Sequence, residues 1–240
     1  MKLSNNKILV TGGASGIGFG LAERFIKDGN TVIICGRRED ALAEASAKLA
    51  GVITHQCDLS NDAGREELFK WISAEHPDLN VLVNNAGIQN WMDISADGFY
   101  DKANDEIATN VTAPLHLTSL FLKLKSPDTI MNVTSGLAFV PLSKVPVYCA
   151  TKAFMRSFTL SLRHQLKSTN TEVIEIIPPA LNTDLGGKGI HDEHPAVSDF
   201  VESIFNQLNE GKNELTFGTS ESRAEANNAA IADYFNRMNP

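Results

Sequence analysis

The sequence has few cysteines and lacks long apolar runs. Cys35, Cys57 and Cys149 form no CxxC pair and are odd in number, so we expect no disulfide framework. The six histidines show no zinc-site spacing, and no metal is expected. No stretch reaches the ~20 apolar residues that span a bilayer, and MKLSNNKILV is no signal peptide. We therefore expect a cytoplasmic protein with no membrane partner.

Positive charge is also in deficit. The 240 residues include 21 Lys and Arg against 29 Asp and Glu, a formal net charge of -8 at pH 7. Nucleic-acid binding needs a basic face, so this balance argues against it, although one or two arginines suffice to hold a phosphate group. A hydrophobic content of 42% is ordinary for a globular protein, and the length suits one α/β domain over residues 1–240.

Short β-branched runs alternate with amphipathic stretches along the chain. Runs such as KILV, VIIC and VIEII are nearly continuous in apolar residues, as in strands covered on both faces. The alternation predicts a Rossmann-type, doubly wound, mostly parallel seven-stranded sheet with helices on both faces. The expected strands are Lys7–Thr11, Thr31–Cys35, Val52–Cys57, Val81–Val83, Thr129–Thr134, Glu172–Ile177 and Glu214–Phe217.

The C-terminal part of the chain is expected to contain one irregular loop and two helices. Residues 182–197 contain three glycines and two histidines and are expected to form a mobile loop beside the substrate. A helix is expected from about Val197 to Leu208. A further helix, rich in alanine and asparagine, is expected over about 220–238.

The first predicted strand leads into a glycine-rich turn, TGGASGIG at 11–18, and a helix follows. Gly12 permits the tight turn, Gly16 lets the backbone approach a pyrophosphate, and Gly18 allows helix and strand to pack closely. The helix N-terminus, with Ser15 and Ile17, offers N–H groups to an anion. Alone, such a turn could be a plain tight turn. At the start of an α/β chain it indicates a dinucleotide site.

The second predicted strand is followed by Arg37 and Arg38, where an acid that binds the ribose of NAD would be expected. Arg37 can pair with a 2′-phosphate, so we expect NADP(H) in preference to NAD(H). The alternative is a solvated, basic helix start. Asp58, followed by Leu59, is placed to accept from the adenine amino group or to cap the next helix, and both could hold.

Tyr148 and Lys152 lie four residues apart in a helical stretch that opens after Pro146, so they share one helix face. A phenol with a pKa of ~10 is a poor acid–base group at neutral pH. A nearby ammonium favours the phenolate, so Lys152 is expected to lower the pKa of Tyr148. Ser135 ends a strand run, where its hydroxyl can hold a substrate oxygen. The YxxxK pattern alone is common in proteins. The alternative interpretation is that Tyr148 lies on the surface and packs over the aliphatic part of the Lys152 side chain.

Four separated motifs occur in the order and spacing of the short-chain dehydrogenase/reductase family, which the chain resembles over essentially its whole length. They are TGGASGIG at 11–18, Asn84-Asn85-Ala86-Gly87, Ser135, and Tyr148-Cys149-Ala150-Thr151-Lys152. Within the family the chain resembles the DltE-like bacterial members. The resemblance implies a catalytic tetrad in which Tyr148 is the general acid/base, Ser135 binds the substrate oxygen, and Lys152 holds the nicotinamide ribose. Asn110 is its fourth member.

The resemblance also implies cofactor contacts from two further segments. The first supplies Asn84, Ala86 and Gly87 and braces the sheet beside the cofactor. The second, Pro178–Thr183, resembles the family's PGxVxT stretch, from which Pro178 and Thr183 contact the cofactor.

Two residues depart from the family pattern. Pro179 stands where glycine is usual and removes a backbone donor. Ser15 stands where many NADP-using relatives carry a basic residue, which leaves more of the discrimination to Arg37 and Arg38. The resemblance further implies homodimers or homotetramers, paired through the helices that carry Asn110 and Tyr148.

Asn110 permits a separate physical argument. It lies in a helical stretch expected from about Asp105 to Lys123, and Pro114 follows four residues later. Because Pro114 has no N–H, the Asn110 carbonyl loses its helical donor and the helix should kink. We expect a water on that carbonyl to connect to Lys152 and carry protons to solvent. The alternative is a helix boundary at Pro114 with Asn110 as a cap.

The substrate pocket is expected to be mostly apolar, which predicts an apolar or weakly polar substrate. Trp91 and Met92 either line its mouth or fill a gap. Cys149 should face the helix packing rather than the site, because successive helical residues point about 100° apart. Besides the loop, the expected lining residues are Gln89, Leu137, Ala138 and Val145.

These observations predict an oxidoreductase that transfers a hydride between nicotinamide C4 and a carbonyl or secondary alcohol. One alternative is an NADP(H)-binding sensor without turnover, which the intact tetrad disfavours. Another is an epimerase or dehydratase, whose larger C-terminal domain this chain is too short to contain.

Overall fold

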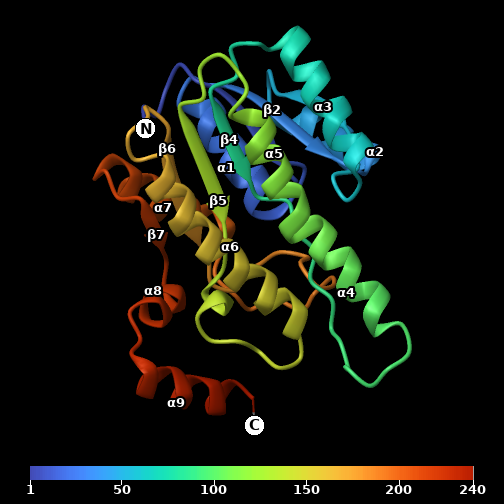
Figure 1. Ribbon diagram of the computed structural model, residues 1–240, viewed down its shortest axis with the longest axis vertical. Coiled ribbons are helices and arrows are strands. Elements are labelled where there is room, and N and C mark those ends of the chain that lie inside the picture. The colour runs from blue at the N-terminus through green and yellow to red at the C-terminus, as the bar shows by residue number, and fades with distance from the viewer. Residues whose placement is uncertain (240) are drawn as a thin grey trace.

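Within residues 1–239, seven parallel strands form one sheet in the order β3-β2-β1-β4-β5-β6-β7 (Figure 1). The computed structural model describes residues 1–239. The order reverses between β1 and β4, and a crevice for ligands forms at the carboxyl ends of strands at such a point. The predicted doubly wound sheet is confirmed. Its strands are β1 Lys7–Thr11, β2 Thr31–Gly36, β3 Ile53–Gln56, β4 Val81–Asn84, β5 Thr129–Val133, β6 Glu172–Ile177 and β7 Glu214–Thr216.

Helices cover both faces of the sheet, as the apolar strand runs predicted. They are α1 Gly16–Lys27, α2 Glu39–Lys48, α3 Asp62–Glu75, α4 Phe99–Ile107, α5 Ala113–Phe121, α6 Pro146–Gln165, α7 Val197–Asn209, α8 Thr219–Ala224 and α9 Asn228–Met238. Within residues 1–239, none of these helices is both long and apolar enough to cross a bilayer.

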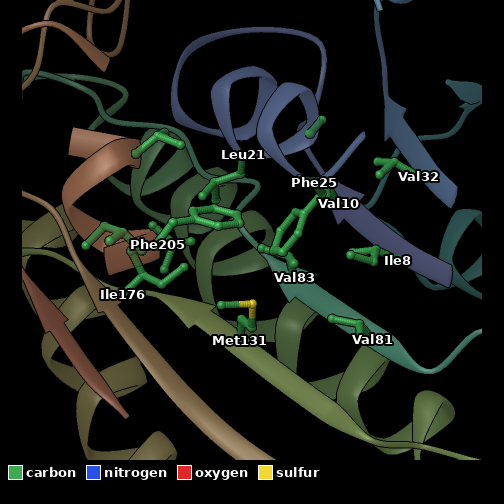
Figure 2. Packing of buried hydrophobic residues seen from close by; sticks show 14 of the residues in the cluster. Ile8, Val10, Leu21, Phe25, Val32, Val81, Val83, Met131, Ile176 and Phe205 are labelled. Atoms are coloured by element: carbon green, nitrogen blue, oxygen red, sulfur yellow. The ribbon is translucent and has the colours of Figure 1, made fainter. Parts of the chain in front are cut away.

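Alternate residues of each central strand enter opposite halves of the core. Ile8 and Val10 of β1 pack beneath α1 and α7, whereas Leu9 faces α3 and α5. Figure 2 shows the first half, where the rings of Phe25 and Phe205 meet edge to face with centroids 4.9 Å apart. Burying each ring contributes about 1.5–3 kcal/mol to the stability of the fold. The packed sheet supports the loops at its carboxyl edge.

The segment around Pro114 differs from the predicted kinked helix. The helix begins at Phe99, earlier than expected, and a π-helical turn at Ala108–Thr112 joins α4 to α5. There the Ala113 N–H bonds the carbonyl of Ala108, five residues back. The wider turn accommodates the proline in the first turn of α5, where its missing N–H is tolerated. Figure 1 shows α4 and α5 continuing as one long rod.

The C-terminal segment forms two helices rather than the single one predicted over 220–238. α8 ends at Ala224, and the side chain of Asn227 accepts a hydrogen bond from the Ala230 N–H to begin α9. An asparagine cap satisfies a free N–H at a new helix start, so the asparagines that suggested a continuous helix instead divide it. None of the residues of α9 is buried, and the helix lies away from the sheet (Figure 1).

Candidate active site

The glycine turn between β1 and α1 has the backbone that its sequence predicts. Gly12 and Gly16 have φ values of 64° and 54°, in the left-handed region that glycine adopts readily. A Cβ on Gly18 would lie 2.4 Å from the Gly12 carbonyl oxygen, so only glycine fits. A Cβ on Gly13 would lie 2.4 Å from Ile34 Cγ2, a constraint that sequence reasoning did not assign.

The N-terminus of α1 is open to an anion. Ser15 is its N-cap residue but makes no side-chain capping hydrogen bond, and the first turn contains no acidic residue. The first N–H groups of a helix have no partner inside the helix, and they carry partial positive charge. The turn therefore fits a pyrophosphate group.

A cavity of about 1020 Å³ runs along the carboxyl edge of the sheet. It extends from Arg37 and Asp58, past the glycine turn, to Tyr148 and the 182–187 part of the predicted loop. Gly18 and Asn84 are buried behind its wall. The predicted cofactor residues that line it are Gly12, Ser15, Gly16, Ile17, Arg37, Arg38, Asp58, Leu59, Ala86, Gly87, Tyr148, Lys152, Pro178 and Thr183.

Asp58 lies on the cavity and does not cap the next helix. Its Oδ1 accepts from the Ser60 N–H at 2.9 Å, whereas Asn61 caps α3. Burial raises the pKa of Asp58, but the Ser60 hydrogen bonds and the charge of Arg37 outweigh this, and the net pKa is lowered. The capping alternative is therefore wrong, and an ionised acceptor faces the cavity beside a guanidinium group.

The Asn84–Gly87 segment is locked to the first strand. The Thr11 hydroxyl accepts from the N–H groups of Asn85 and Ala86 at 2.9 and 3.0 Å. The Asn85 amide donates to the Thr11 carbonyl at 2.9 Å. Asn84 points into the protein, where its amide donates to Asn132 Oδ1 at 2.9 Å across the β4–β5 pair. The segment braces the sheet and fixes two walls of the cavity relative to each other.

Tyr148 and Lys152 lie side by side on α6 and both line the cavity. The Lys152 Nζ is 5.5 Å from the centre of the tyrosine ring and donates to the Val133 carbonyl at 2.8 Å. Both side chains are almost fully buried, so the surface-tyrosine alternative is wrong. Ser135 lies where β5 ends and accepts from the Leu137 N–H at 3.0 Å. Its hydroxyl lowers the pKa of Tyr148 by hydrogen bonding.

Burial controls the protonation of this pair. It raises the pKa of Tyr148 well above the ordinary value of 10, and the Ser135 hydroxyl offsets only part of the rise. Burial also lowers the pKa of Lys152 from 10.5 to about 8. The expectation that Lys152 lowers the pKa of Tyr148 is therefore not met. The ammonium lies over the ring face and bonds Val133, so desolvation dominates.

Asn110 lies in the π-helical turn, and its side chain ties three elements together. Its amide donates to the Ile88 carbonyl at 2.8 Å and to Thr151 Oγ1 at 3.2 Å, and its Oδ1 accepts from the Ile88 N–H at 2.8 Å. A Cβ on Gly87 would lie 3.3 Å from Asn110 Oδ1 and 3.7 Å from Lys152 Nζ. Asn110 and Lys152 therefore lie next to the same side of Gly87.

The predicted substrate-lining residues separate into two groups. Gln89 lines the cavity. Leu137 and Val145 instead pack in an apolar cluster beside Tyr148, and Val145 is fully buried, so it forms the support of the site rather than its surface. Ala138 ends a short 3-10 turn at Gly136–Ala138.

The structure also shows where Cys149 and Trp91 lie relative to the site. Cys149 is buried, with its sulfur against the backbone of Leu142, and burial raises the pKa of its thiol. It faces the packing, as expected. Trp91 is 41% exposed, and its Nε1 would lie 3.4 Å from a Cβ on Gly186, so it borders the 182–197 loop.

Sequence reasoning missed Glu106, which lies on α4 one helical turn before Asn110. The residue is 0% exposed, and its carboxylate accepts from the Asn90 N–H. Its sequence neighbours, DKANDEIATN, are largely polar, so the local pattern is typical of a solvated helix face and gives no signal of burial.

Comparison with known proteins identifies the family. The family model for short chain dehydrogenases matches residues 6–194. The chain is 46% identical to the uncharacterized oxidoreductase DltE of Bacillus subtilis (strain 168) over 250 residues, covering 100% of this chain and 98% of that protein. It is 34% identical over 175 residues to the NADP-dependent 3-hydroxy acid dehydrogenase YdfG of Escherichia coli (strain K12), covering 71% of each.

The fold also matches a solved structure. The short chain dehydrogenase of Burkholderia cenocepacia J2315 in complex with NADP superposes with a TM-score of 0.82 at 22% identity, covering 99% of both chains. The matched family model and the identity to DltE bear out the resemblance seen in the motifs. The chain belongs to the short-chain dehydrogenase/reductase family of oxidoreductases.

Proposed function

We propose that the protein is an NADP(H)-dependent oxidoreductase that transfers a hydride between nicotinamide C4 and a carbonyl or secondary alcohol, with Tyr148 as the general acid/base. The observation that carries this proposal is that Tyr148 and Lys152 line the same cavity as the glycine turn. When bound, the nicotinamide supplies the hydride for reduction or accepts it in oxidation.

The protein's own residues manage the substrate oxygen and its proton. Because burial keeps the Tyr148 phenol protonated at neutral pH, it is ready to donate a proton to that oxygen. The Ser135 hydroxyl, at the end of β5, holds the same oxygen and stabilises its developing charge. A neutral phenol suits carbonyl reduction, whereas alcohol oxidation requires the phenolate and therefore higher pH.

The electrostatics of the other end of the cavity favour a 2′-phosphate. Arg37 and Arg38 line it directly after β2. A guanidinium group forms paired, charge-assisted hydrogen bonds with phosphate, and a ribose-binding acid is missing from this strand end. The NADP dependence in the name of the YdfG relative supports this preference. Asp58, beside them, is placed to accept from the adenine amino group.

Protons reach Tyr148 through Lys152 in this proposal. Pro114 deprives the Asn110 carbonyl of a helical donor, and a water there would connect to the Lys152 ammonium.

The predicted homodimer or homotetramer stays part of the proposal. Ile107 on α4 and Phe154 and Leu160 on α6 are exposed apolar side chains on the helices that the family resemblance assigns to pairing. The proposed compartment is the cytoplasm.

A cofactor titration followed by a carbonyl screen tests the proposal. Binding of NADPH and NADH is compared first, and NADPH consumption is then followed with a panel of apolar ketones and aldehydes. We expect tighter binding of NADPH than of NADH, and turnover that Tyr148→Phe lowers by about 10²–10⁴ without loss of NADPH binding. Binding without turnover of any carbonyl would instead support a sensor.

A further inference from the structure

Glu106 is a buried carboxyl group beside the site that the proposed mechanism does not use. One oxygen accepts from the Asn90 N–H, and the other is buried with no hydrogen-bond partner among residues 1–239. Burying a carboxylate with an unsatisfied oxygen costs free energy. Burial accordingly raises the pKa of the Glu106 carboxyl group.

Glu106 and Asn110 lie one helical turn apart and face the same segment, Ile88–Asn90. Asn110 bonds both backbone groups of Ile88, and Glu106 bonds the backbone N–H of Asn90. Together the two side chains hold the residues on either side of Gln89. These bonds hold the backbone on both sides of Gln89 in place.

That segment forms one wall of the cavity. Ile88, Gln89 and Asn90 all line the cavity that contains Tyr148. The Gln89 Oε1 would lie 2.6 Å from a Cβ on Gly186, so the wall also meets the substrate-side loop. If the hydrogen bond from the Asn90 N–H to Glu106 were lost, the backbone of Ile88–Asn90 would become free to move beside Tyr148.

The charge of Glu106 also acts on the reacting phenol. α4 packs against α6, and Glu106 raises the pKa values of both Tyr148 and Cys149. Other charged groups near the site are Lys102 and Asp105 on α4, Asp184 in the loop and Lys152 on α6, which line the cavity, and Arg223 on α8, which acts on Cys149. An ionised carboxylate disfavours a phenolate nearby, as like charges do.

We propose that Glu106 is a positioning residue for the proposed reaction: its carboxylate fixes Asn90 and thereby holds the Ile88–Asn90 wall in register with Tyr148. The inference rests on the proposed function for its kinetic consequences, but the clamp itself is a property of the folded chain. Glu106 lies behind the wall and acts through Asn90.

Three variants separate the parts of this proposal. Glu106→Gln keeps a carbonyl oxygen for the Asn90 N–H but removes the charge, and Glu106→Ala removes both. Asp101→Asn removes the same charge from an exposed position on α4 and serves as the matched control. For each, we would measure NADPH binding, kcat and KM for a carbonyl substrate, the pH profile of alcohol oxidation, and amide exchange at Asn90.

Glu106→Ala should lower kcat/KM about 100-fold, the order of loss expected for a misplacement of about 1 Å at a reacting centre. Its NADPH affinity should stay within about twofold, which shows that the fold persists, and its Asn90 amide should exchange about tenfold faster or more. Glu106→Gln should restore most of kcat/KM and the protection. It should also move the rise of alcohol oxidation with pH to lower pH, because a phenolate forms more readily without a neighbouring negative charge. Asp101→Asn should change neither kcat/KM nor this pH profile.

Wild-type kinetics and exchange in Glu106→Ala would overturn the proposal. A Glu106→Gln variant as impaired as Glu106→Ala would do the same. A wild-type protein that binds NADPH but reduces no carbonyl would refute the proposed function instead. In that case the exchange rate of Asn90 in Glu106→Ala still decides whether the clamp exists.

Discussion

Replacing Lys152 with methionine should change how the stability of the fold depends on pH. The ammonium is buried and donates to the Val133 carbonyl, and burial lowers its pKa from 10.5 to about 8. Methionine occupies a similar volume and carries no charge. The substitution therefore removes the titrating group with little change in packing.

The sign of the effect follows from proton binding. Between pH 8 and 10.5 the unfolded chain keeps the proton on Lys152 while the folded chain releases it. Stability rises with pH wherever the unfolded state binds more protons. The destabilisation by this lysine is thus fully present below pH 8 and is lost above 10.5.

The magnitude is large enough to measure. Lowering the Lys152 pKa from 10.5 to about 8 decreases the free energy of unfolding by about 3.4 kcal/mol at low pH, at about 1.36 kcal/mol per pKa unit. Raising the pH from about 7 to about 10 restores about 2.5 kcal/mol of this stability. Tyr148 and Cys149 have raised pKa values and lower the stability in the same range. The difference between wild type and Lys152→Met isolates the lysine.

Urea unfolding of both proteins at pH 7, 8, 9 and 10 measures this difference. We expect wild type to gain about 2.5 kcal/mol relative to Lys152→Met across the series. Parallel stability curves for the two proteins would refute the assignment of a depressed lysine pKa, and with it the buried geometry of the pair.

Three further substitutions test separate parts of the site. Tyr148→Phe should lower kcat by about 10²–10⁴, the usual contribution of a positioned acid, with NADPH affinity unchanged in a binding titration. Arg37→Ala should weaken NADPH binding about 10-fold or more, the value of a charge-assisted hydrogen bond, and leave NADH binding nearly unchanged; equal losses for both would exclude a 2′-phosphate contact. Gly18→Ala should destabilise the fold by about 1–3 kcal/mol in urea unfolding, because its Cβ would meet the Gly12 carbonyl at 2.4 Å.

The sheet was predictable because its strands are buried on both faces. The runs Lys7–Thr11 and Glu172–Ile177 match β1 and β6 residue for residue. The other strands differ by one or two residues at their ends, where hydrogen bonding to neighbours decides the boundary.

The helices were less predictable where tertiary contacts override local pattern. Pro114 correctly indicated an irregular helix, but whether it produces a kink or a π-helical turn depends on the packing of α4 and α5 against α6. Asn227 could equally continue a helix or cap a new one, and the structure uses it as a cap.

The site was predictable in its spacing and not in its electrostatics. One helical turn places Tyr148 beside Lys152 from sequence alone. The direction of the Tyr148 pKa is set by burial, with a smaller contribution from the charge of Glu106, and both depend on the tertiary structure. Val145 illustrates the same limit, because an apolar residue near the site lines a pocket or supports it according to packing alone.

The fate of a labelled hydrogen tests the central claim most directly. Wild-type protein is incubated with NADPH that carries deuterium at both C4 positions of the nicotinamide and with a carbonyl compound that it reduces, and the alcohol is analysed by mass spectrometry and NMR. We expect deuterium on the carbinol carbon and a solvent proton on its oxygen. Deuterium lost to water, or an alcohol formed without the label, would contradict direct hydride transfer.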